Sequence, residues 1–191
     1  MDFEEWLWAN GIKPMHIDYL RKCLDNVSPV DVSIHARFRE LLNKYVIVGG
    51  MPDDGNRIQS EFKVYMSDIG LLVSMLEDGT QSSILRGELY GYKGAIFENL
   101  VADILGKMGR KLYYYHKNGG IELDFLMRHK GQCVPIECKA TTGNAKSMRT
   151  VLGHPEKYHV DFAIKLGDYN VGMKDKLLTL PMYMAFLLNE V

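Results

Sequence analysis

Two runs of residues decide the fold of this chain: IELDFLMR at positions 121–128 and QCVPIECK at positions 132–139, joined by HKG at positions 129–131. Both runs are rich in apolar residues that alternate with polar ones, and turn-forming residues separate them. This pattern predicts an antiparallel hairpin. With the turn centred on Lys130 and Gly131, Asp124 lies directly opposite Glu137, and their Cβ atoms are expected to be roughly 5 Å apart.

The face of the hairpin that carries these two acids is predicted to be a metal site. Side chains two positions apart on a strand share a face, so Glu122 joins Asp124 and Lys139 joins Glu137. Opposed carboxylates repel each other, whereas Mg²⁺ (or Mn²⁺) binds one or two carboxylates together with substrate phosphate. Lys139 could then orient or deprotonate a water molecule and offset charge on phosphorus. The other face is expected to be apolar, formed by Leu123, Phe125, Val134, Ile136 and Cys138.

A simpler interpretation of the same residues is a salt-bridge cluster. Charged residues that alternate along a strand are typical of a strand that faces solvent, where Asp124, Glu137 and Lys139 would pair across the hairpin. The pattern alone leaves both interpretations open.

Residues 95–108 are predicted to form an amphipathic helix, because their apolar residues recur at helical spacing. Glu98 falls at the edge of the apolar stripe, roughly 20° from the nearest apolar position around the axis. Asn99, Asp103 and Lys107 fall on the side expected to face solvent. Glu98 is therefore a candidate third metal ligand, direct or through water.

The order of elements around the hairpin predicts a mixed α/β sheet with helices on both faces. Strands are expected at 111–116, 121–128, 132–139 and 158–166, a helix at 144–152, and a last apolar stretch at 177–188. The resulting order is α-β-β-β-α-β, an antiparallel meander followed by a crossover helix into another strand.

The first part of the chain is expected to be helical, with a capping box formed by Asp2 and Glu5. The predicted organisation is a helical segment at 1–52, a polar linker at 53–61 and an α/β domain at 62–191. A short strand is expected at 62–66, and Asp68 is expected to cap the helix after it.

The composition is that of an ordinary globular protein, with 191 residues, 47% hydrophobic residues and a formal net charge of −1. No apolar run has the roughly 18–20 residues that a bilayer-spanning helix needs, and the acidic N-terminus is unlike a signal peptide. A cytoplasmic location without a membrane partner is expected. Any nucleic-acid contact has to come from local basic patches, such as Lys107, Arg110, Lys111 and Lys117, or Lys139, Lys146 and Arg149. The three cysteines show no zinc-like spacing and are expected to be reduced.

The residues also resemble a known superfamily. Asp124 followed by Glu137-Cys138-Lys139, with Glu98 on a preceding helix, resembles the PD-(D/E)XK restriction-endonuclease-like superfamily. The resemblance implies a restriction-endonuclease-like fold, Mg²⁺ held by the acids and a lysine that assists attack of water on a DNA phosphodiester. More narrowly, the runs FKVYMSDIGLL (62–72), YKGAIFEN (92–99), ELDFL (122–126) and PIECK (135–139) resemble the uncharacterised domain C-terminal to the core of bacterial and archaeal AAA-type ATPases.

This narrower resemblance implies an ATPase core as a partner, and residues 2–9 with GGMP (49–52) resemble the connection to such a core. The chain has no Gly-x-x-x-x-Gly-Lys-[Ser/Thr] loop, so no ATPase activity is expected. The winged-helix-like stretch of the family is missing as well, which suggests a truncated form. Two functions are therefore carried forward: a metal-dependent nuclease acting on DNA, and a non-catalytic module that binds nucleic acid or protein. Trp6 and Trp8 are expected to mark a surface for the ATPase core or for self-association.

Overall fold

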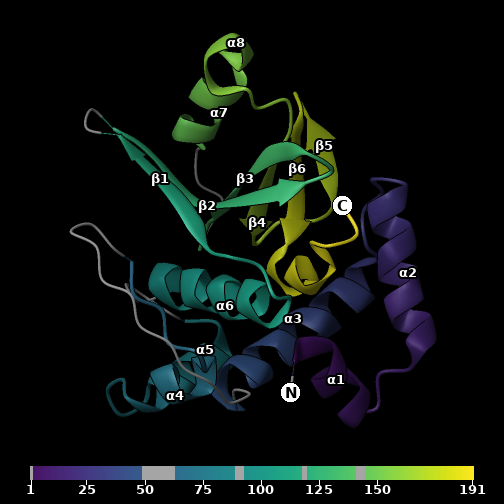
Figure 1. The fold of residues 1–191 in the computed structure, drawn as a ribbon. Helices are drawn as coiled ribbons and strands as arrows, with labels where there is room; N and C mark the ends of the chain where they lie inside the picture. The colour runs from purple at the N-terminus through teal and green to yellow at the C-terminus, as the bar shows by residue number, and fades with distance from the viewer. Residues whose placement is uncertain (1, 49–62, 89–92, 118–119, 141–144) are drawn as a thin grey trace.

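The computed structural model of the chain describes residues 2–48, 63–88, 93–117, 120–140 and 145–191. Its centre is a six-stranded mixed sheet in the order β1-β2-β3-β4-β6-β5, with helices packed around it (Figure 1). The strands are β1 (Tyr113–Lys117), β2 (Ile121–His129), β3 (Gln132–Cys138), β4 (Ala163–Gly167), β5 (Gly172–Lys174) and β6 (Leu177–Pro181). The first three strands form an antiparallel meander, and β4 pairs in parallel with both β3 and β6. The predicted mixed α/β sheet is confirmed.

The helices fall into an N-terminal group and a group that belongs to the sheet. The N-terminal group is α1 (Phe3–Ala9), α2 (Pro14–Asp25), α3 (Val32–Val48), α4 (Ile69–Ser74) and α5 (Thr80–Arg86). The second group is α6 (Lys93–Lys107), α7 (Lys146–Leu152), α8 (Pro155–Tyr158) and the 3-10 helix η1 (Met182–Leu187). The predicted capping box of Asp2 and Glu5 begins α1, and Asp68 caps α4. No described helix is both long enough and apolar enough to cross a bilayer.

The two faces of the sheet are covered by different elements, as Figure 1 shows. On one face, residues of α6 and η1 join the N-terminal helices in a single large apolar cluster that includes Phe125 and Ile136. On the other face, α7 packs Met148 and Val151 against Leu123. The central strands are therefore covered on both sides, whereas the edge strands β1 and β5 are largely exposed, and α7 with α8 forms the crossover from β3 to β4.

The predicted faces of β2 need one correction. Leu123 and Phe125 were expected to share an apolar face, but they belong to the two different clusters. Two steps along β1, from Tyr113 to Tyr115, oppose three steps along β2, from Leu126 to Leu123. Such a bulge places an extra residue in one strand and reverses the alternation beyond it. The irregularity lies at Asp124, one of the predicted site residues.

The strand expected at 62–66 is wrong for the residues that the structure describes. Residues 63–66 are extended but belong to no sheet, and they form a strap across α6. Asn99 holds the strap, because its Oδ1 accepts from the Met66 amide at 2.7 Å and its Nδ2 donates to the Met66 carbonyl at 2.9 Å. The side-chain amide of Asn99 thus makes the two backbone hydrogen bonds that a partner strand would otherwise make.

The polar side of α6 was expected to face solvent, which holds for Lys107 and is wrong for Asn99 and Asp103. Asn99 and Asp103 are buried, with 4% and 7% of their surface exposed. The strap covers Asn99, and Lys107 links Asp103 to Tyr45 of α3. A polar stripe therefore became an interior seam because helices from the N-terminal group pack on it.

Two further predictions changed in detail. The strand expected at 158–166 is shorter than predicted, because Tyr158 ends α8 (Pro155–Tyr158) and β4 begins only at Ala163. Trp6 is buried against Phe3 and Tyr45, so it marks no surface, whereas half of Trp8 is exposed. The proposed linker at 53–61 lies outside the described residues, and the predicted domain boundaries stay predictions.

Candidate active site

The end of β3 brings two of the predicted site residues into direct contact. Glu137 is a buried carboxylate on β3, and Lys139 follows the strand with a third of its side chain exposed. Lys139 Nζ and Glu137 Oε1 are 2.6 Å apart. The Lys139 amide donates to the Leu166 carbonyl of β4 at 2.8 Å, which fixes the backbone beside the lysine. The predicted E-x-K pair is therefore held by the sheet itself.

Asp124 reaches the same place from β2. The ladder between β2 and β3 has the predicted register, from Phe125–Ile136 to His129–Gln132, and it ends just before Asp124 and Glu137. Asp124 Oδ2 accepts a hydrogen bond of 2.8 Å from the backbone N–H of Cys138, the residue between Glu137 and Lys139. The bulge thus turns this carboxylate onto the backbone of the E-x-K segment.

The surroundings of Asp124 oppose its ionisation. Burial raises its pKa most strongly, the Cys138 hydrogen bond lowers it, and the nearby Glu98 raises it again, so that the pKa reaches about 6. Burial and the same carboxylates raise the pKa of the Cys138 thiol as well. The site is therefore short of positive charge for the carboxylates it holds.

Glu98 lies near Asp124 but is held by the strap rather than by the other acids. Its Oε1 accepts from Tyr65 Oη at 2.6 Å and from Lys63 Nζ at 2.9 Å. Lys63 also pairs with Glu122 Oε1 at 3.0 Å and lies 4.0 Å from Asp124 Oδ1. One ammonium group therefore stands among three carboxylates, and it connects Glu98 to Asp124.

Both lysines of the site are cations at neutral pH in the metal-free chain. Burial lowers the pKa of Lys139, but its bond to Glu137 and the charge of Asp124 outweigh this effect and raise it. The same holds for Lys63, whose bonds to Glu98 and Glu122 outweigh burial. A protonated Lys139 is suited to orienting a water molecule or to stabilising negative charge, and less suited to removing a proton.

One carboxylate oxygen of this cluster stands out. Glu137 Oε2 is buried and has no hydrogen-bond partner among the described residues. A buried charged oxygen without a partner is costly, and such groups in native proteins usually have a functional explanation or bind an ion. Because Mg²⁺ needs only one or two carboxylates together with water and phosphate oxygens, Asp124 and Glu137 fit this group.

The expected set of three acids is not assembled around one point. Within the described ranges, no group of three or more His, Cys, Asp or Glu side chains lies close enough to hold a metal ion. Lys63 and Tyr65 hold the carboxylate of Glu98. The structure therefore brings Asp124, Glu137 and Lys139 to the end of β3, and Lys63 pairs with Glu98 beside Asp124.

The sequence interpretation missed three residues at this site. Lys63 and Tyr65 are two positions apart on the strap, so both point to the same side, but only their contact with Glu98 gives them a role. Lys165 lies opposite Glu137 in the ladder of β3 and β4, is only 7% exposed, and has its Nζ 4.4 Å from the centre of the Tyr169 ring. A lone lysine within the apolar run FAIKLG was the signal that could have found it.

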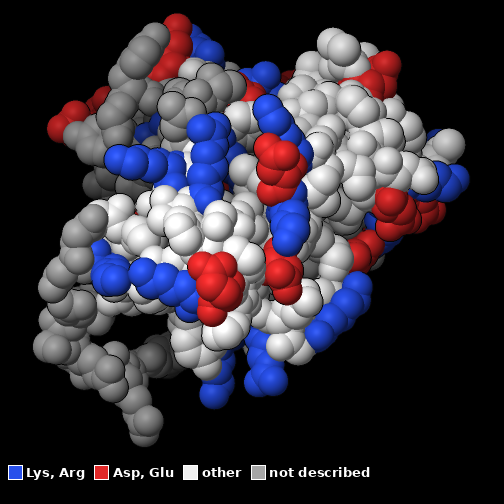
Figure 2. Space-filling model, turned by 90° about the horizontal axis from the view of Figure 1, so that it is seen from above, with Lys and Arg blue, Asp and Glu red and all other residues white. Residues whose placement is uncertain are grey.

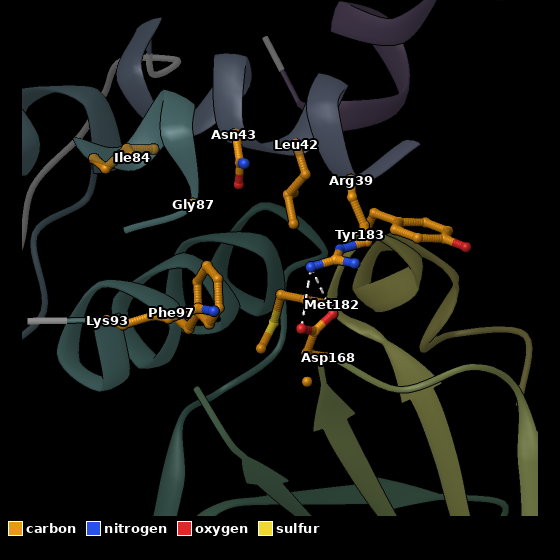
Figure 3. A pocket seen from close by; sticks show the side chains of 11 residues that line it. Arg39, Leu42, Asn43, Ile84, Gly87, Lys93, Phe97, Asp168, Met182 and Tyr183 are labelled. Atoms are coloured by element: carbon orange, nitrogen blue, oxygen red, sulfur yellow. Dashed lines mark hydrogen bonds and ion pairs between the residues drawn. The ribbon is translucent and has the colours of Figure 1, made fainter. Parts of the chain in front are cut away.

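A pocket elsewhere on the molecule is distinct from this cluster. It lies between α3, α6 and η1, and Arg39 and Asp168 pair within it at 2.9 Å (Figure 3). None of the predicted site residues lines it. Asp168 neutralises Arg39, while Lys93 lies over the Phe97 ring, and the pocket does not contribute to the chemistry of the carboxylates.

In addition to Lys63 and Lys139, the helix α7 carries exposed basic side chains close to β2. Ser147 Oγ accepts from the Glu122 amide at 3.3 Å, so α7 begins beside β2. Lys146 and Arg149 of this helix are exposed. Figure 2 shows basic and acidic side chains interspersed over the described part of one face, without a broad surface of a single sign. Contacts with phosphates would therefore be few and local.

Comparison with known proteins gives one match. No curated protein and no solved structure matched the chain. Residues 93–184, which include α6 and the whole sheet, match the family model described as a domain of unknown function, DUF4143. This domain is found in proteins associated with AAA-type ATPases. The part of the chain that carries Glu98, Asp124, Glu137 and Lys139 is thus similar to that domain.

Proposed function

We propose that this chain is a Mg²⁺-dependent nuclease that acts on DNA phosphodiester bonds, built on a restriction-endonuclease-like core. The observation that carries the proposal is the buried Oε2 of Glu137, which has no partner in the part of the chain that the structure describes. It lies next to Lys139 and within one residue of the amide that binds Asp124. The order from α6 through the meander β1–β3 to α7 and β4 supports the fold part of the proposal.

The roles follow from the positions of the side chains. Asp124 and Glu137 would hold the cation, and Glu98 would reach it directly or through water. A bound Mg²⁺ would polarise a phosphate oxygen and lower the pKa of a coordinated water molecule. Lys139, cationic beside Glu137, would orient the attacking water and stabilise charge on the phosphate. Lys146 and Arg149 on α7 would contact the flanking phosphates.

The direct test is cleavage of plasmid and single-stranded DNA by the purified chain with Mg²⁺ or Mn²⁺, with a chelator as the negative control. Asp124→Asn, Glu137→Gln and Lys139→Met should each reduce cleavage by about a hundredfold or more, because each removes a cation ligand or the charge beside the phosphate. Glu156→Gln, an acid-to-amide change on exposed α8, should leave cleavage unchanged. Equal DNA cleavage by the wild type and by the three site variants would point to a contaminating nuclease and contradict the proposal.

A second function is favoured by one observation, the position of Lys63 among the carboxylates. An internal ammonium group already offsets part of their charge, as it would in a module that binds no metal. The chain would then be a non-catalytic module that binds nucleic acid or protein beside an ATPase core. Binding that is indifferent to chelators and to Asp124→Asn, together with no cleavage, would favour this second function.

A further inference from the structure

We propose that Lys63 is a built-in competitor of the divalent cation and sets the affinity of the site for metal. The inference rests on the proposed function, because it concerns the same carboxylates. It starts from the contacts of Lys63 Nζ, which lies 2.9 Å from Glu98 Oε1, 3.0 Å from Glu122 Oε1 and 4.0 Å from Asp124 Oδ1.

The ion pairs around Lys63 contain more negative than positive groups. Within the ion pairs of this cluster, Lys63 and Lys139 face the carboxylates of Glu98, Glu122, Asp124 and Glu137. Negative groups outnumber positive ones by two within these pairs, and by one when the buried Lys165 opposite Glu137 is counted, so the cluster keeps an excess of negative charge. A cation bound between Asp124 and Glu137 lies close to Lys63, and like charges at such distances in a partly buried site repel strongly.

The second step concerns Glu98. Its Oε1 accepts from both Lys63 and Tyr65, and these bonds hold the carboxylate on the strap. Glu98 can turn toward a cation only when Lys63 releases it. Lys63 therefore opposes metal binding in two ways, by repulsion and by holding the third ligand.

The third step concerns the strap itself. Asn99 fixes the strap at Met66 through two hydrogen bonds, whereas Lys63 is held by its ion pairs with Glu98 and Glu122 and lies over the Tyr114 ring, 5.7 Å from its centre. The side chain of Lys63 is partly exposed, at 23%. The ammonium group can thus move into solvent while Met66 stays in place, and metal loading requires a side-chain displacement rather than the opening of the fold.

Titration calorimetry with Mn²⁺ alone tests the inference without any need for activity. Lys63→Gln should tighten Mn²⁺ binding by about tenfold or more, because it removes the repelling charge and releases Glu98. Lys63→Arg keeps the charge and should bind as weakly as the wild type. Lys146→Gln removes the same charge from exposed α7 and is the matched control for a general change in field; its effect should be much smaller.

A second measurement uses the wild-type chain, so it stands even if Lys63→Gln fails to fold. Saturation with Mn²⁺ should increase the acylation of Lys63 by a water-soluble amine reagent, read by mass spectrometry, while Lys146 serves as the internal reference. Unchanged or reduced labelling of Lys63 in the metal-loaded chain would overturn the inference.

The outcomes separate this inference from the proposed function. If the wild type binds Mn²⁺, Glu137→Gln abolishes binding and Lys63→Gln binds no more tightly than Lys146→Gln, the metal site stands and the competitor role falls. Weak or no binding by the wild type, with binding by Lys63→Gln that is lost in the double variant with Glu137→Gln, supports both. If no variant binds Mn²⁺, both proposals are wrong.

Discussion

Two buried acids in this molecule, Asp103 and Glu137, have the same kind of neighbour and opposite consequences. Each is almost fully buried, and each pairs with a lysine, Lys107 at 2.7 Å and Lys139 at 2.6 Å. Asp103 pairs with Lys107, which also donates to the Tyr45 hydroxyl at 3.0 Å, although burial raises the pKa of Asp103. Glu137 Oε2 has no partner among the described residues, and Asp124 accepts a hydrogen bond from the amide of the next residue, Cys138.

The difference separates a structural ion pair from a candidate site. A buried pair whose hydrogen-bonding groups are satisfied gains nothing from a ligand, whereas an excess of buried carboxylate is costly until a cation arrives. We therefore expect the Asp103 carboxylate to stabilise the folded chain. We expect Asp124 and Glu137 to bind a cation and to lower the stability of the chain when no cation is bound. Each of the following predictions tests this contrast.

The largest effect is expected at the structural pair. Asp103→Ala leaves Lys107 half-buried without its carboxylate, and the free energy of unfolding should fall by about 3 kcal/mol. Urea denaturation followed by circular dichroism measures the change. A loss below about 1 kcal/mol would show that the pair is not structural, and the contrast with Glu137 would disappear.

A somewhat smaller loss is expected beside the E-x-K segment. A Cβ at Gly167 would lie 2.6 Å from the Lys139 carbonyl oxygen and 2.7 Å from the Tyr169 ring. Gly167→Ala should therefore destabilise the chain by about 1–3 kcal/mol through overpacking and shift the backbone of Lys139. Thermal denaturation and the amide chemical shifts of residues near Lys139 provide the measurement. Unchanged shifts would mean that the end of β3 is loosely held.

At the candidate site, by contrast, a substitution is expected to increase the free energy of unfolding. Asp124→Asn keeps an acceptor for the Cys138 amide and removes a charge that burial disfavours, so the metal-free chain should gain on the order of 1 kcal/mol at neutral pH. Since the folded pKa is raised to about 6 from its ordinary value of 3.8, the wild type loses stability as pH rises through this interval.

The advantage of the asparagine variant should therefore grow between the two pKa values and level off above about 6. Paired melting curves across this range, in the presence of a chelator, measure it. A variant less stable than the wild type at neutral pH would mean that Asp124 has a structural role like that of Asp103.

The smallest effect is expected at Glu122, whose side chain is 56% exposed although it pairs with Lys63. Glu122→Gln should change the free energy of unfolding by less than about 0.5 kcal/mol, as is usual for exposed pairs. The same denaturation assay serves, with Asp103→Ala as the positive control. A large loss would show that Lys63 is needed for the fold, which would weaken its role as a competitor.

The sequence was sufficient for the hairpin and for the order of elements around the sheet. Alternation and the turn at Lys130 and Gly131 determine the register of β2 and β3, so that Phe125 faces Ile136 as predicted. Alternation of apolar and polar residues is visible within a single strand, so the pairing of these two neighbouring strands can be predicted from their own residues. The E-x-K pair follows from the same local rule.

The remaining features depend on contacts between distant parts of the chain. The bulge at Asp124 arises from the pairing of β2 with β1, which alternation does not reveal. Lys63 is 35 positions from Glu98, and its role depends on the path of the strap. Asn99 and Asp103 are predicted to face solvent from the local pattern, because the strap and α3, which bury this side of α6, are distant in the sequence. Local propensity does not contain such tertiary cover.

The most direct measurement is the anomalous scattering of a crystal soaked to saturation with Mn²⁺. The expected result is a single strong peak within coordination distance of Asp124 and Glu137, with Glu137 Oε2 as one of its ligands. A map without a peak there, or with Glu137 Oε2 bonded to a protein donor instead, would contradict the metal site and leave only the non-catalytic module.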